Sequence, residues 1–103
     1  MRIHFIAIGG AIMHSLAIEL HKNGHLVTGS DDIIYDPAKS NLSEQGLLPN
    51  HEGWNDHIIT RDLDMVIIGM HAKINNPELL KAQKVGISIL SFPCNTQSIT
   101  IMQ

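Results

Sequence analysis

A turn of small residues, Gly9-Gly10-Ala11, connects an apolar run to a helical pattern and is the first candidate for chemistry. Small side chains let a ligand approach the backbone, and the free amides at a helix N-terminus carry about half a positive charge. Ile12 and Met13 continue the turn into the helix and would offer the next amides. The same turn also suits a strand-to-helix connection that binds nothing. We therefore treat residues 9 to 13 as a candidate phosphate site.

An acidic pair, Asp31-Asp32, follows a second candidate strand, 21 positions after Gly10. A carboxylate at about 20 residues from a glycine turn accepts hydrogen bonds from ribose hydroxyls in dinucleotide-binding units. Taken alone, each aspartate is equally a solvated turn residue. The G-x-G-x-x-G fingerprint is not met, because Ala7 and Ile12 occupy its first and last positions, and Ile12 is expected to push the helix outward or change the turn. Turn and acidic pair together favour a nucleotide.

His71 and Lys73 follow a later apolar run and should face the same crevice. A histidine can donate to a phosphate or a uracil oxygen, and a lysine can neutralise charge, although each also suits a surface loop. The seven histidines lack a metal-binding spacing, and the single cysteine, Cys94, forms neither a C-x-x-C pair nor a disulfide framework. No catalytic residue, no metal site and no ATP-binding G-x-x-x-x-G-K-[ST] loop is expected.

The elements that position these residues alternate along the chain. Apolar runs at 3–8, 65–68 and 87–90 predict buried parallel strands, 25–28 is a weaker candidate, and Leu47-Leu48 is a stub that Pro49 cuts short. Helices are expected from Gly10 to Gly24, from Asp36-Pro37 to Gly46, and from Asn76-Pro77 to Gly86, with Trp54 to Ile58 as a turn of helix over the sheet. This order predicts an α/β, Rossmann-like open parallel sheet of about five strands with helices on both faces. Ligands bind such sheets beyond the carboxyl ends of the strands.

Composition limits the class of protein. A chain of 103 residues is one domain, and 44% apolar with 17% charged residues excludes disorder. The net charge of −3 argues against nucleic acid as a partner. The longest apolar run, 65–70, is too short to span a membrane, and the chain shows no signal segment, so we expect a cytoplasmic protein.

Four parts of the chain form one recognisable combination: Ile3 to Met13, Leu16-Ala17, Gly24 with Val27 to Asp31, and Asn76 to Leu79 with Gly86-Ile87. Together they resemble the N-terminal, UDP-binding domain of the Mur ligase family. Within that family the similarity is nearest to the alanine-adding and tripeptide-recycling ligases. It covers residues 1–93, whereas 94–103 looks like an atypical C-terminal tail.

The resemblance implies a function. UDP-N-acetylmuramate or a UDP-muramyl peptide would be the ligand, with Gly9, Gly10 and Ala11 against the diphosphate, Asp31 at the uridine end, and residues 70–73 on the other side. ATP and magnesium would bind a central domain that this chain lacks, so the chain alone would not be catalytically competent. Two alternatives stay open: an NAD(P)-type regulatory module, which Ile12 disfavours, and an interaction fragment that self-associates through exposed apolar surface.

Overall fold

A mostly parallel sheet forms the centre of the molecule, in a computed structural model that describes residues 1–69, 73–92 and 101–102. The strand order is β2-β1-β3-β4-β5. The first four strands pair in parallel and β5 pairs antiparallel with β4. The strands are β1 (Arg2–Ile6), β2 (Leu26–Ser30), β3 (Met65–Gly69), β4 (Ser88–Phe92) and β5 (Ile101–Met102). The α/β prediction is confirmed, with four strands rather than five in the parallel part.

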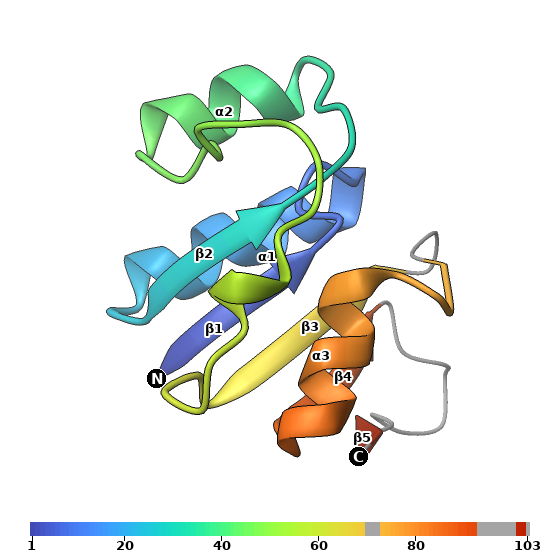
Figure 1. Cartoon of the computed structure of the whole chain (residues 1–103). Coiled ribbons are helices and arrows are strands. Elements are labelled where there is room, and N and C mark those ends of the chain that lie inside the picture. The colour runs from blue at the N-terminus through green and yellow to red at the C-terminus, as the bar shows by residue number, and fades with distance from the viewer. Residues whose placement is uncertain (70–72, 93–100, 103) are drawn as a thin grey trace.

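Helices cover both faces of this sheet, as predicted (Figure 1). They are α1 (Ala11–Lys22), α2 (Ala38–Glu44), the 3₁₀ turn η1 (Asp56–Ile58) and α3 (Pro77–Val85). Side chains alternate across a strand, so Ile3 and Phe5 of β1 pack towards α1 and α2, whereas Ile6 packs on the α3 side. The two buried apolar clusters on these faces hold the helices against the sheet.

Helix α3 begins and ends where its sequence signals predict. The Asn76 side chain accepts hydrogen bonds from the backbone N–H groups of Glu78 and Leu79, at 2.9 and 3.3 Å. Gly86 ends the helix with a left-handed φ of +88°. Helix α2 starts one residue later than predicted, since Pro37 rather than Asp36 is its N-cap. Asp36 still accepts from the backbone N–H of Ser40, at 2.9 Å.

Three strand predictions differ from the structure. Leu47-Leu48 is not a strand: the N–H of Leu47 donates to the Leu42 carbonyl, and the Leu47 side chain packs into the core beside α2. Strand β1 ends at Ile6 rather than at residue 8, because Ala7 takes a left-handed φ of +69° that an extended strand cannot hold. The short antiparallel β5 lies in the segment predicted as a tail, where apolar patterning gave no strand signal.

Candidate functional site

A cavity of about 520 Å³ lies beyond the carboxyl ends of the central strands. Ala7 follows β1, Asp31 and Asp32 follow β2, and Lys73 follows β3, so three neighbouring strand ends contribute to its lining. The complete lining is Ala7, Asp31, Asp32, Trp54, Lys73, Asn75, Asn76 and Pro77. The topology thus brings Asp31, Asp32 and Lys73 together, as the sequence predicted. His71 lies outside the described residues.

The glycine turn is fixed to the end of β2 by its own backbone. The N–H groups of Ala7 and Ile8 both donate to the Ser30 carbonyl, at 2.8 and 3.1 Å. The Ile8 side chain is fully buried and fills the space above Gly29, where an added Cβ would lie only 2.3 Å from Ile8 Cδ1. The absence of a side chain at position 29 therefore allows the turn to pack directly on β2.

Asp31 connects this turn to the acidic pair. Its Oδ2 accepts a hydrogen bond from the Gly9 N–H and its Oδ1 accepts one from the Asp32 N–H, both at 2.8 Å. Each carboxylate oxygen has a second lone pair, so a ribose hydroxyl could still donate to Asp31. Asp32 is exposed and lines the cavity, which leaves its carboxylate accessible.

The amides available to an anion are those of the first turn of α1. The N–H of Gly9 is bound to Asp31, and that of Gly10 points to the Ala7 carbonyl at 3.3 Å. The first N–H that donates within the helix is that of His14, to the Gly10 carbonyl at 2.9 Å, so the N–H groups of Ala11, Ile12 and Met13 have no intrahelical acceptor. Their N-cap, Gly10, provides no side-chain hydrogen bond. None of these three residues is among those that line the cavity. An extended ligand is needed to reach both places.

Side chains do not obstruct this helix start. Ile12 has a relative accessibility of 53%, so its side chain does not come between α1 and the sheet and gives no reason for the helix to move outward. Met13 is buried and packs near the positions of Gly10 and Gly69, which makes its side chain part of the core. His14 is also buried: its Nδ1–H donates to the Gly10 carbonyl at 2.9 Å, and the Asn41 amide approaches Nε2 at 3.4 Å. It therefore joins α1 to α2.

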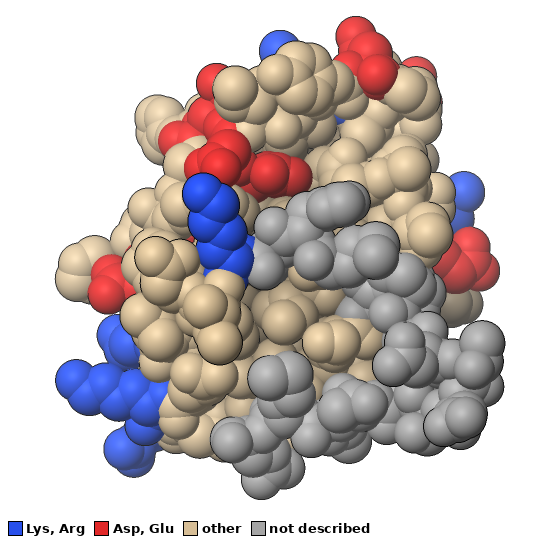
Figure 2. Space-filling model, turned by 90° about the vertical axis from the view of Figure 1, so that its right-hand side faces the viewer, with Lys and Arg blue, Asp and Glu red and all other residues tan. Residues whose placement is uncertain are grey.

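The cavity carries charges of both signs. Burial raises the pKa of Asp31 above its ordinary value of 3.8, outweighing the two backbone hydrogen bonds, which lower it. Lys73 supplies a cation to the same lining. On the side of the molecule shown in Figure 2, a basic side chain lies against a group of acidic ones. This mixture suits a ligand with both an anionic group and hydroxyl donors.

Trp54 is the lining residue that local sequence patterns placed least well. It packs against the apolar cluster under α3, as the prediction of a core or edge aromatic expects. It also lines the cavity, which that prediction did not include. It reaches this place because the Gly53 N–H donates to the Asp31 carbonyl at 2.7 Å. The sequence predicts Asn76 and Pro77 only as a helix start and does not single out Asn75. Their place in the lining follows from the rule that a helix after a parallel strand begins at the carboxyl edge.

Within residues 1–69, 73–92 and 101–102, no three His, Cys, Asp or Glu side chains gather as metal ligands. No helix among these residues has the length and apolar content needed to cross a bilayer.

The family model for "Mur ligase family, catalytic domain" matches residues 2–100, and the chain therefore belongs to the Mur ligase family. The UDP-N-acetylmuramate–L-alanine ligase of Carboxydothermus hydrogenoformans is 34% identical over 90 residues, which are 87% of this chain and 19% of that protein. The UDP-N-acetylmuramate–L-alanyl-γ-D-glutamyl-meso-2,6-diaminoheptandioate ligase of Escherichia coli is 34% identical over 93 residues, covering 90% of this chain and 20% of that protein.

Solved structures agree with this assignment. A murein peptide ligase from Psychrobacter arcticus superposes with a TM-score of 0.76 at 31% identity, covering 86% of this chain and 18% of that one. The corresponding ligase from Neisseria meningitides gives a TM-score of 0.75 at 28% identity, covering 87% of this chain and 28% of that one. The chain thus spans about a fifth of the length of the curated relatives it matches.

Proposed function

We propose that this chain binds the UDP part of UDP-N-acetylmuramate, or of a UDP-muramyl peptide, as a domain of a peptidoglycan ligase. The supporting observation is that Ala7, Asp31, Asp32 and Lys73 line one cavity at the carboxyl edge of a Mur ligase sheet. The relatives named above are ligases of UDP-N-acetylmuramate. In such a ligase, ATP and magnesium would bind a central domain, as the family resemblance implies.

The chemistry of the site suggests how the ligand lies. The uridine would occupy the cavity, with ribose hydroxyls donating to Asp31 or Asp32 and the base near the Trp54 ring. The diphosphate would extend to the amides of Ala11, Ile12 and Met13, where the helix dipole stabilises negative charge. Gly9 and Gly10 would contribute close approach rather than free amides, since both N–H groups have partners in the fold.

The test is a titration of the 103-residue chain with UDP, UDP-N-acetylmuramate and NADH, followed by amide chemical shifts. We expect UDP to shift Ala11, Asp32 and the Trp54 indole. Lys73→Gln should weaken UDP binding by up to about fivefold, the value of one exposed ion pair. Lys84→Gln is the matched control, because Lys84 is exposed in the last turn of α3, away from the cavity lining. Absence of shifts at millimolar UDP would refute the proposal, and a response to NADH alone would favour the dinucleotide alternative.

Self-association stays a separate prediction. The relative accessibilities of Tyr35, Ile74 and Ile33 are 71%, 86% and 52%. Exposed apolar residues favour protein contacts where they form one contiguous patch. A sizing column run at several concentrations distinguishes a monomer from a dimer.

A further inference from the structure

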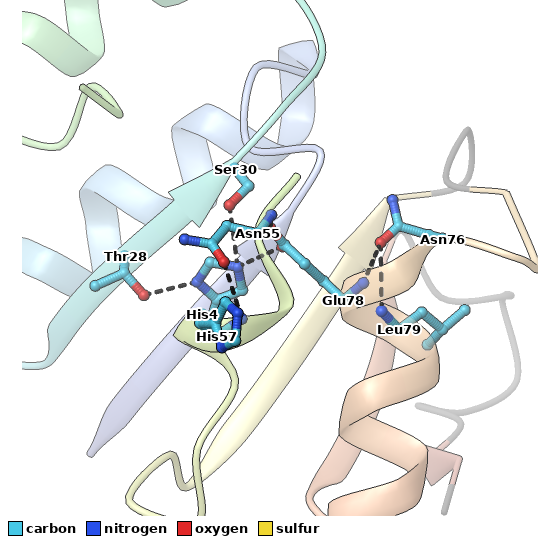
Figure 3. A network of polar contacts seen from close by, with 8 residues as sticks. All are labelled: His4, Thr28, Ser30, Asn55, His57, Asn76, Glu78 and Leu79. Carbon is cyan, nitrogen blue, oxygen red and sulfur yellow. Dashed lines mark hydrogen bonds and ion pairs between the residues drawn. The ribbon is translucent and has the colours of Figure 1, made fainter. Parts of the chain in front are cut away.

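A buried ionisable pair joins His4 on β1 to Glu78 on α3, which directly follows the cavity-lining Asn76 and Pro77 in the chain (Figure 3). Both side chains are completely buried, and His4 Nε2 lies 2.8 Å from Glu78 Oε1. The other ring nitrogen of His4 lies 2.8 Å from the Thr28 hydroxyl, and Ser30 Oγ approaches Nε2 at 3.4 Å. Burying two such groups costs free energy that an apolar pair of the same volume would avoid. Packing alone therefore does not account for the pair.

The second oxygen of Glu78 shows what else the pair does. Glu78 Oε2 accepts a hydrogen bond from the backbone N–H of Asn55, at 2.9 Å. The Asn55 side chain in turn accepts from the N–H of His57 at 3.0 Å and starts the η1 turn. One buried carboxylate thus binds the strand β1 and the segment that enters η1.

Trp54 lies between two fixed neighbours as a result. Gly53 on one side is bonded to Asp31, and Asn55 on the other side is bonded to Glu78. Glu78 also belongs to the first turn of α3, directly after Asn76 and Pro77, which form another part of the cavity lining. The same residue therefore fixes two parts of the cavity wall relative to each other.

We propose that Glu78, held in place by His4, is a positioning residue that keeps Trp54 at the wall of the ligand cavity. The consequence for ligand affinity rests on the proposed UDP function, whereas the position of Trp54 can be measured without any ligand. Because Glu78 is completely buried, it acts through Trp54 and Asn55 and touches no ligand itself.

The single tryptophan of the chain makes the test direct. Glu78→Leu removes both hydrogen bonds while keeping a side chain of similar size, and Glu78→Gln restores an acceptor for Asn55. We expect acrylamide to quench Trp54 fluorescence more strongly in Glu78→Leu and near the wild-type level in Glu78→Gln. UDP affinity should fall about tenfold in the leucine variant, the equivalent of one hydrogen bond to a charged group. Asp64→Asn is the matched control, because Asp64 accepts a backbone N–H from Arg2 at 2.7 Å but is absent from the cavity lining.

The outcomes separate the two proposals. Unchanged quenching in a folded Glu78→Leu variant overturns the positioning role. Stronger quenching with unchanged UDP affinity supports the positioning of Trp54 and overturns its consequence for ligand binding. A wild-type chain that binds no UDP refutes the proposed function, while the quenching result still decides the position of Trp54. Should the leucine variant not fold, hydrogen exchange of the Asn55 amide in the wild-type chain decides instead. Protection of that amide supports the contact, and exchange at the rate of an unfolded chain overturns it.

Discussion

Two adjacent glycines in the turn before α1 should respond very differently to alanine. A Cβ added to Gly9 would lie 2.8 Å from Asp31 Oδ2 and 3.0 Å from Ile34 Cγ1, closer than such atoms approach. Relief requires the carboxylate to leave the Gly9 N–H, at a cost of roughly 1.5–3 kcal/mol, or the buried Ile34 to shift, at roughly 1–3 kcal/mol. Alanine also reduces the conformational entropy of the unfolded chain, which stabilises the fold by about 0.4–1 kcal/mol. We expect Gly9→Ala to lower the free energy of unfolding by about 2 kcal/mol.

Gly10→Ala is the matched control. Its Cβ would meet only Met13 Cγ at 3.3 Å, the flexible part of a methionine, and the backbone φ of −60° accepts any residue. The unfolded-state gain is offset by a poorer N-cap, so the change should stay within about 0.5 kcal/mol. Urea unfolding followed by Trp54 fluorescence should then separate the two midpoints by about 1 M, given a slope of roughly 1–3 kcal/mol per molar. Equal midpoints would refute the role assigned to the Gly9–Asp31 contact.

Three further predictions concern stability. Ala7→Gly should raise the free energy of unfolding by about 0.5 kcal/mol, because glycine adopts the φ of +69° without strain; a lower urea midpoint would contradict this. Asn76→Ala should lower it by about 1 kcal/mol through loss of the α3 cap, measured in the same way, and an unchanged midpoint would contradict the capping role. Burial raises the pKa of Asp31, so the folded state disfavours the ionised carboxylate. The free energy of unfolding of the wild type should therefore rise relative to that of Asp31→Asn as the pH falls from neutral, through the raised pKa, to 3.8. The urea midpoint of the wild type, compared with that of Asp31→Asn, should increase as the pH falls across that range. A decrease would show that the fold lowers the pKa of Asp31.

The sequence predicted the elements that depend on residues close to one another in the chain. Helix α3 was predicted at both ends because Asn76-Pro77 and Gly86 act on neighbouring backbone groups. Asp31 was predicted at the site because the strand before it fixes where the chain leaves the sheet.

The rest depends on partners distant in sequence. Glu78 reads locally as an acidic residue in a helix first turn, yet its partner His4 lies 74 residues away. Trp54 stands in a segment without regular periodicity, and its position follows from contacts of its neighbours with Asp31 and Glu78. The spacing of apolar residues predicts neither the contact of Glu78 with His4 nor the position of Trp54.

The packing of Ile8 over Gly29 has a consequence for ligand recognition. Since strand packing and the Ser30 carbonyl already hold the backbone at residues 7 and 8, that backbone has its shape before any ligand arrives. Under the proposed UDP binding, little loop entropy would then be lost on association, which would favour the one ligand shape that fits over others. Rigidity at this corner of the sheet would thus be a source of selectivity.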